Sequence, residues 1–472
     1  MVTTLFANAE LVDEFGATTR KNVLCVDGVV TEISEPTTTP PKSVDQVIDV
    51  ENCALLPGLH DHHVHLLAMA AAIAGCDVAA IDSPAEFDRI ISSRSGPTPL
   101  RVTGYDEFRH GELDRYRLDR LSNNAVVRVQ HRSGLAWILS TSALEIFGQS
   151  DAAGFERDVH GEPTGRLLRL DNEIAQRFGQ MDLDLAPVLQ RFHAVGITGV
   201  TDATFRLGDR AQLLRQAFTA GEIPNRLVLL GLDSETDISD FAVHGPAKIL
   251  IDEVREIDIK QLAEEIAYWH AQKRAVAIHA VSRVENVAAV TALQLAGVLP
   301  GDRIEHGSIL CNDTDEFLAA NNIAVVVQPT LVYERGDFYF ESIENDDVPF
   351  AHRAASLRQS GIVVAAGSDA PVTDCDPWLA IATAQSRITR NGSTFRPEES
   401  VSAFTALQWY LANPLQLAGP IRKVERGAPA DFCILNVPLA EMLSQPSAQK
   451  VRTTFVAGVE FPTSMRPAGP MS

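Results

Sequence analysis

The stretch that decides the fold ends the first strong apolar run and reads Leu55-Leu56-Pro57-Gly58-Leu59-His60-Asp61-His62-His63-Val64-His65-Leu66. Alternate side chains of a strand point to one face, so we expect Asp61, His63 and His65 to face the same way. Neutral imidazole is the commonest metal ligand in proteins. Two imidazoles at this spacing therefore predict half of a metal site, whose other ligands must come from elsewhere in the chain.

Outward from this stretch, apolar β-branched runs alternate with helical patterns, as parallel βα units require. Eight runs predict strands: Leu55–Leu66, Ile197–Ala203, Arg226–Leu232, Ala247–Asp252, Val276–Val281, Arg303–His306, Ala324–Pro329 and Val363–Ser368. Helices are expected between them, for example at Ile259–Lys273, Arg283–Ala296 and Asp315–Asn321. Eight strands close a (β/α)8 barrel, so the sequence predicts an α/β protein with a TIM-like barrel over residues 55–419.

The ends of the chain and one long interval differ from this pattern. Short β-like pieces occupy both ends, and a turn at Asp27-Gly28 joins two of them. Residues 1–54 and 420–472 are therefore expected to pair into one small β domain. The interval between the first two barrel strands is too long for one crossover. We expect residues from about 70 to 185 to form an insertion over the barrel mouth that helps to enclose substrate.

Composition narrows the class of protein. The 472 residues include 62 acidic and 40 basic ones, and the net charge of -22 disfavours nucleic acid or an anionic membrane as partner. Six scattered cysteines without a C-x-x-C pair suit reduced thiols in a cytosol. We expect no signal peptide, and the sequence has no apolar stretch of the ~20 residues that span a bilayer. A cytoplasmic protein that acts on a small molecule is expected, and a homo-oligomer stays possible.

Residues that commonly bind metals recur at the ends of the predicted strands, where barrels of this kind have their active sites. They are His63, His65, Lys248, His279, His306 and Asp369. A lone buried histidine is usually a packed core residue, but four imidazoles at one rim favour a shared divalent metal. Such a metal lowers the pKa of bound water towards ~7, and Asp369 can accept its proton. The alternative for Asp369 is a helix N-cap, since Ser368-Asp369-Ala370-Pro371 resembles a helix start.

The ordered set of motifs resembles the amidohydrolase superfamily, and within it the YtcJ-like branch (amidohydrolase family 3) that includes N-substituted formamide deformylase. The matching stretches are PGLHDHHVHL (57–66), AKILID (247–252), AIHAV (277–281), GDRIEHG (301–307), VVQP (326–329), GSDAPV (367–372) and GAPADFCIL (427–435). The last of these resembles the β-sandwich segment of that family. The resemblance implies a metal-dependent hydrolase built on a barrel with a composite β-sandwich.

The resemblance also implies roles for single residues. His63 and His65 would hold the first, more buried metal, while His279 and His306 would hold a second metal or complete a single site. Asp369 would be both ligand and proton carrier. Lys248 would be carboxylated by CO₂ and bridge two metals, because a plain ammonium beside cations is repelled. The alternative for Lys248 is an ion pair with Asp252. Zinc is the expected metal, as one or two ions, because nitrogen ligands dominate.

The sequence departs from the family pattern in places that bear on substrate. Relatives carry a histidine in the insertion, where this chain has Gly134. His131 or Arg132 would take over that substrate contact, or the two form a solvated surface pair. At the end of the seventh strand, Gln328 would donate to a substrate carbonyl or cap a loop. Asp61 either steers a histidine or stabilises its strand.

Three functions are compatible with this set of residues. The first is hydrolysis of a non-peptide C–N bond, in a linear amide or formamide, with Asp369 as proton shuttle. The second is a cyclic-amide hydrolase or deaminase on the same metal platform, since substrate choice resides in loops. The third is a binding protein that kept the barrel and lost its chemistry, against which the intact ligand set weighs.

Overall fold

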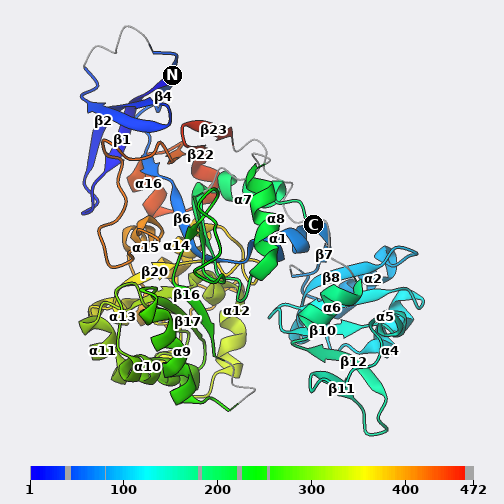
Figure 1. Cartoon of the computed structure of the whole chain (residues 1–472). Coiled ribbons are helices and arrows are strands. Elements are labelled where there is room, and N and C mark those ends of the chain that lie inside the picture. Colours follow the sequence, from blue (N-terminus) through cyan, green and yellow to red (C-terminus); the bar gives the residue numbers. More distant parts are fainter. Residues whose placement is uncertain are drawn as a thin grey trace. The chain divides into compact units, whose positions relative to one another are not determined.

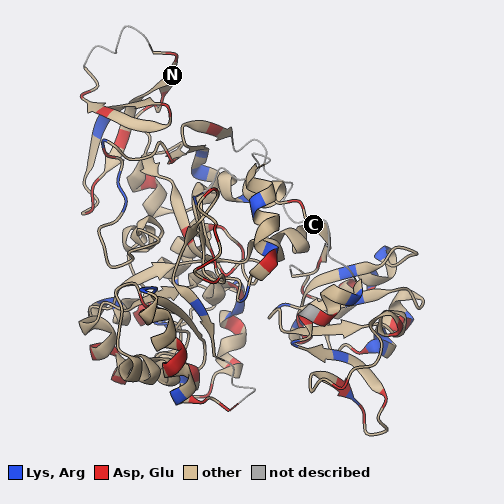
Figure 2. Ribbon diagram, viewed as in Figure 1, with Lys and Arg blue, Asp and Glu red and all other residues tan. Residues whose placement is uncertain are grey.

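The chain folds into two compact units with mixed α/β structure (Figure 1). The computed structural model describes residues 2–37, 44–79, 81–178, 183–219, 226–251 and 256–462. The first unit holds the described residues up to 65 and from 189 onward, and the second holds residues 66–188. Acidic and basic residues are interspersed along the ribbons of both units (Figure 2). Within the described ranges no helix is long and apolar enough to cross a membrane.

Parallel strands form the centre of the first unit. One sheet has the order β15-β14-β13-β6 and the other the order β16-β17-β18-β19-β20. Their bounds are β6 (Leu59–Val64), β13 (Ile197–Asp202), β14 (Arg226–Leu229), β15 (Val243–His244), β16 (Ala247–Leu250), β17 (Val276–Ala280), β18 (Arg303–His306), β19 (Ala324–Val327) and β20 (Val364–Ala366). Most of these residues are buried, which is why most of the strands read as largely apolar runs, whereas β6 and β18 also bury histidines and acids. Each of the eight predicted segments contains one of these strands.

Hydrogen bonds connect the two parallel sheets at both junctions. The Lys248 N–H donates to the Leu230 carbonyl at 3.1 Å, and the buried Arg274 guanidinium donates to Leu230 and to two other carbonyls near it. At the other junction, the Asp369 N–H donates to the His63 carbonyl at 2.7 Å. The carboxyl ends of β6 and β20 therefore lie beside each other, although 300 residues of sequence separate them.

Helices follow the strands, and their ends reflect local capping. The Asp258 side chain accepts from the N–H groups of Lys260 and Gln261 and begins α9 (Ile259–Ala271). A capping box of Ser282 and Glu285 begins α10 (Arg283–Ala296), whose predicted bounds are confirmed. The other helices of the described first unit are α7 (Ala186–Ala194), α8 (Ala211–Thr219), α11 (Asp315–Ala320), α12 (Pro329–Ser342), α13 (Ala355–Gln359), α14 (Pro377–Ser386), α15 (Ala403–Leu411) and α16 (Leu439–Ser444).

The ends of the chain build two further sheets, with the orders β3-β2-β1-β4 and β23-β22-β21-β5. Their bounds are β1 (Thr3–Val12), β2 (Thr18–Val26), β3 (Val29–Ser34), β4 (Gln46–Asp49), β5 (Leu55–Pro57), β21 (Phe432–Leu435), β22 (Val451–Val456) and β23 (Val459–Pro462). The Phe6 ring meets Phe432 and Phe455 edge-on, with centroids 5.1 and 4.9 Å away. These aromatic contacts lie in an apolar core that both sheets share.

The predicted strand Leu55–Leu66 is wrong in extent, because the structure divides it at Gly58. The first part, β5, pairs antiparallel with β21, and only β6 joins the parallel sheet. A side chain at Gly58 would meet Thr198 Oγ1 at 2.1 Å, so the close approach of β13 requires glycine there. One polypeptide stretch thus serves two sheets of the first unit.

The second unit contains a six-stranded sheet with the order β11-β12-β10-β9-β8-β7. Its strands are β7 (Cys76–Asp77), β8 (Leu100–Tyr105), β9 (Val127–His131), β10 (Ala136–Leu139), β11 (Phe155–Arg157) and β12 (Pro163–Leu168). Its helices are α1 (Leu66–Ala74), α2 (Pro84–Arg94), α3 (Glu107–His110), α4 (Arg115–Ser122), α5 (Thr141–Phe147) and α6 (Asp171–Phe178). Two separate apolar clusters form its core.

Candidate metal centre

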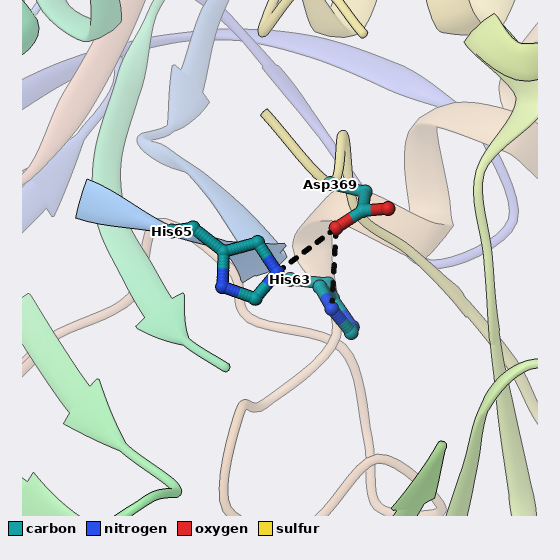
Figure 3. Close-up of side chains that lie close together, drawn as sticks. All are labelled: His63, His65 and Asp369. Atoms are coloured by element: carbon teal, nitrogen blue, oxygen red, sulfur yellow. Dashed lines mark ion pairs between the residues drawn. The ribbon is translucent and has the colours of Figure 1, made fainter. Parts of the chain in front are cut away.

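Three of the predicted ligands converge at the junction of β6 and the segment after β20. Nε2 of His65 lies 3.0 Å from Oδ1 of Asp369, and Nε2 of His63 lies 3.5 Å from the same oxygen (Figure 3). One ligand atom from each residue falls within 4.8 Å of the others. The alternation of β6 accounts for this geometry, because it directs both imidazoles to one face.

His63 is held from its far side by charged neighbours. Its Nδ1 contacts the Glu305 carboxylate, which also accepts a hydrogen bond from Arg303 at 2.6 Å. Burial on its own would raise the pKa of Glu305, but Arg303, His63 and Lys248 hold it well below its usual range. Burial, and then the charge of Lys248, lower the pKa of His63 to about 3. The imidazole is therefore neutral and Glu305 is ionised.

His65 lies on the open side of the cluster. Its Nδ1 is 3.3 Å from the Thr204 hydroxyl, which follows β13. The His65 side chain is 26% exposed and that of Asp369 is 12% exposed, whereas that of His63 is only 1% exposed. The cluster therefore contacts solvent on the side of His65 and Asp369.

Two more predicted imidazoles form a second pair beside His63. Nε2 of His306 lies 3.1 Å from Nδ1 of His279, and the His306 ring centroid is 4.7 Å from that of His63. The other nitrogen of His306, Nδ1, lies 2.8 Å from Oε1 of Gln328. Nε2 of Gln328 donates to the Val326 carbonyl, and Gln328 precedes α12 without a capping hydrogen bond from its side chain. Its role as a donor to substrate stays a prediction.

Lys248 is buried, and within the described residues its Nζ has no hydrogen-bond partner. Burial lowers the pKa of Lys248, while the nearby carboxylates of Glu305 and Asp369 act in the opposite direction. The alternative partner Asp252 lies outside the described residues. Lys248 is thus close enough to the cluster to feel the charges of its acids.

Asp369 and Asp61 have different tasks at the same junction. Asp369 is not a helix N-cap, because α14 begins eight residues later and Asp376 caps it. Its φ of 58° and the φ of 74° at His306 are left-handed, a conformation that concentrates at functional sites. Oδ1 of Asp61 accepts from the N–H groups of His63 and Ser368, both at 3.0 Å. Asp61 therefore stabilises the strand junction rather than steering an imidazole.

The other two predicted substrate contacts belong to the second unit. His131 bonds Glu107 at 2.9 Å and the Ser133 hydroxyl at 2.7 Å. Arg132 forms an ion pair with Asp106 at 3.0 Å. Both side chains thus have partners within their own unit, and their contact with substrate stays a prediction.

The residues at this junction fit a divalent metal. Nε2 of His63 and Nζ of Lys248 are buried atoms without a hydrogen-bond partner in the described part of the chain. Imidazole nitrogen and carboxylate oxygen are the donors that zinc-like cations take. Sequence reasoning missed Glu305 and Thr204, which contact the outer nitrogens of His63 and His65. The signal for Glu305 was a charged Arg-x-Glu pair in a buried parallel strand, since buried charges are almost always paired.

Known proteins are similar to this chain over most of its length. The chain is 25% identical to N-substituted formamide deformylase of Arthrobacter pascens, over 88% of this chain and 89% of that protein. It is 23% identical to putative amidohydrolase YtcJ of Bacillus subtilis, over 87% and 89%. An uncharacterized metal-dependent hydrolase from Pyrococcus horikoshii has a similar fold, with a TM-score of 0.72, 17% identity, and coverage of 92% of this chain and 97% of that one. The model of the amidohydrolase family matches residues 46–461, so this chain belongs to that family of metal-dependent hydrolases of carbon–nitrogen bonds.

Proposed function

We propose that this protein hydrolyses a linear amide or a formamide, with a divalent metal held by His63, His65 and Asp369 and completed by His279, His306 and Lys248. The observation that carries the proposal is the convergence of the imidazoles of His63 in β6 and His65 just after it on one Asp369 oxygen. The likeness to N-substituted formamide deformylase supports the choice of substrate class. Zinc is the proposed ion, as one or two per chain, because nitrogen donors dominate the set.

The architecture that we propose for this chemistry is a closed (β/α)8 barrel with a composite β-sandwich from residues 1–54 and 420–472. The hydrogen bonds between Lys248 and Leu230 and between Asp369 and His63 support closure, since they connect the two parallel sheets at both junctions. The insertion of about residues 70–185 is proposed to select substrate. In such a barrel the site lies at the carboxyl ends of the strands.

The residues of the chain have separate tasks in this hydrolysis. When bound, the metal lowers the pKa of water towards ~7 and polarises the substrate carbonyl. Asp369 directs Oδ1 at the two imidazoles, so its Oδ2 is left to accept a proton from the attacking water and to deliver it to the departing nitrogen. Burial lowers the pKa of Lys248. We propose that its free-amine form adds to CO₂ and releases one proton, and that the resulting carbamate carries its negative charge into the site.

An assay of the purified chain tests the proposal directly. Protein freed of metal with a chelator and reloaded with zinc is given N-substituted formamides, linear N-acyl amines, cyclic amides and aminopurines. We expect formate or carboxylate release from the linear compounds, only in the reloaded protein and not in its Asp369→Asn variant. Turnover confined to cyclic amides or aminopurines would assign the site to the other chemistry, and absence of zinc binding would refute the proposal.

A further inference from the structure

The outer nitrogen of His63 meets a buried ion pair from a strand that is distant in sequence. Its Nδ1 contacts Oε2 of Glu305, across a sequence separation of 242 residues. Oε1 of Glu305 accepts from Nε of Arg303 at 2.6 Å. The Arg303 guanidinium donates in turn to the carbonyl of His62 at 3.3 Å. All three side chains are at most 1% exposed, so this chain of contacts is shielded from water.

We propose that Glu305 is a positioning residue for metal binding, which fixes the ring and the proton of His63 so that Nε2 stays free as a ligand. This inference rests on the proposed function, because it takes His63 as a metal ligand. A neutral imidazole carries one N–H donor and one acceptor nitrogen, and an ionised carboxylate can only accept. Contact with Glu305 therefore requires the proton on Nδ1 and leaves the lone pair on Nε2.

The direction of the ring agrees with this assignment. Nε2 of His63 points towards Asp369 at 3.5 Å and has no hydrogen-bond partner among the described residues. Carboxylate partners on the outer nitrogen of a histidine fix its tautomer and raise the basicity of the ligating nitrogen. The Arg303 contact to the His62 carbonyl also holds the backbone next to His63. The Arg303–Glu305 ion pair thus fixes the ring orientation, the proton position and the neighbouring backbone of His63.

The outer partners of the other imidazoles are weaker restraints. The Thr204 hydroxyl beside His65 can donate or accept, so it permits either tautomer. The Gln328 amide beside His306 offers a neutral acceptor. Glu305 is ionised and accepts only, and charge-assisted hydrogen bonds are about twice as strong as neutral ones. Among these three partners we therefore expect Glu305 to contribute most to metal affinity.

The zinc affinity of Glu305→Gln tests this inference without measuring catalysis. Glutamine keeps the shape and an acceptor oxygen but removes the charge. We expect zinc affinity, measured by chelator competition on the full chain, to fall roughly 10–100-fold at unchanged stoichiometry. The matched control is Glu399→Gln, another buried glutamate, which bonds Ser356 and Arg396. It should lower the melting temperature and leave zinc affinity unchanged.

Each outcome has a definite meaning. Equal zinc affinity of Glu305→Gln and wild type overturns the inference and leaves the proposed function intact, whereas a wild type that binds no zinc overturns both. Glu305→Gln leaves Arg303 buried without its counter-charge, so the double variant Arg303→Met/Glu305→Gln removes both charges and must show the same loss of affinity. Neutron diffraction from the wild type needs no variant. A deuteron on Nδ1 of His63 supports the inference, and one on Nε2 refutes it.

Discussion

The two faces of β6 carry the same side chain in different surroundings. His63 and His65 point to Asp369, and their outer nitrogens meet Glu305 and Thr204. On the other face, the described structure gives His60 and His62 no ion pair with a carboxylate. Nε2 of His60 bonds the Thr201 hydroxyl at 2.9 Å, and its ring lies 4.7 Å from that of His62.

The difference lies in charge rather than in residue type or burial. Burial, followed by the interaction with His62 and the charges of Arg422 and Arg303, holds the pKa of His60 well below its usual range. Such a face would repel a cation. Around His63 lie the acids Glu305 and Asp369, whose negative charges can compensate the charge of a bound cation. We therefore propose the face of His63 and His65 as the metal site, because only these two imidazoles form contacts with the carboxylates of Glu305 and Asp369 among the described residues.

The largest expected effect comes from replacing one histidine of each face by glutamine, in separate variants. His63→Gln should reduce metal affinity by more than about 100-fold, since loss of an outer partner alone costs 10–100-fold. Activity should fall to background with it. His62→Gln is the matched control from the opposite face and should keep its zinc. Equilibrium dialysis of both variants measures their zinc affinity. Equal loss of zinc from both would contradict the proposed difference between the two faces.

The next effect concerns Asp369, whose Oδ1 lies near the imidazoles of both His63 and His65. Asp369→Asn should lower kcat by about 10²–10⁴-fold, because the amide cannot take up and release the proton. Steady-state kinetics at saturating zinc measures this loss, together with the zinc content of the variant. An Asp369→Asn variant that binds zinc and keeps more than a tenth of the wild-type rate would contradict the assigned role.

A smaller effect is expected from the two threonines that contact the two faces. Thr204→Val removes the partner of His65 and should weaken zinc binding about tenfold, at the low end for an outer partner, since the contact is 3.3 Å long. Thr201→Val removes the partner of His60 and should cost about 1 kcal/mol of stability with zinc affinity unchanged. Zinc titration and urea unfolding of both variants separate the two outcomes.

The smallest expected effect is a change in how stability depends on pH. The pKa of His60 is lowered in the folded state. Below about pH 6.5, His60 therefore binds a proton in the unfolded chain but stays neutral in the folded one. Stability therefore falls as pH drops through that value. His60→Gln should make this slope shallower by up to about 1.4 kcal/mol per pH unit. Urea unfolding between pH 7 and 5 measures it, and identical slopes would contradict the prediction.

Local patterns allowed much of the parallel core to be predicted. Continuous apolar runs located the strands, and Ser282 with Glu285 located the start of α10. The short string Glu334-Arg335-Gly336-Asp337 has the composition of a loop, yet these residues lie inside α12. There the Gly336 backbone approaches Thr389, and Asp337 accepts from the Thr389 hydroxyl at 2.7 Å. That long-range contact outweighs the loop preference of a short Glu-Arg-Gly-Asp string.

The sequence by itself determined which histidines share a face, because strand alternation is a property of the local backbone. It also supplied the ligand types at the strand ends. Only the tertiary structure decided which face of β6 meets acids, since Glu305 lies in β18, 242 residues away, and Asp369 follows β20, about 300 residues away. Electrostatic interactions depend on distance in space, and no periodicity along the chain records that distance.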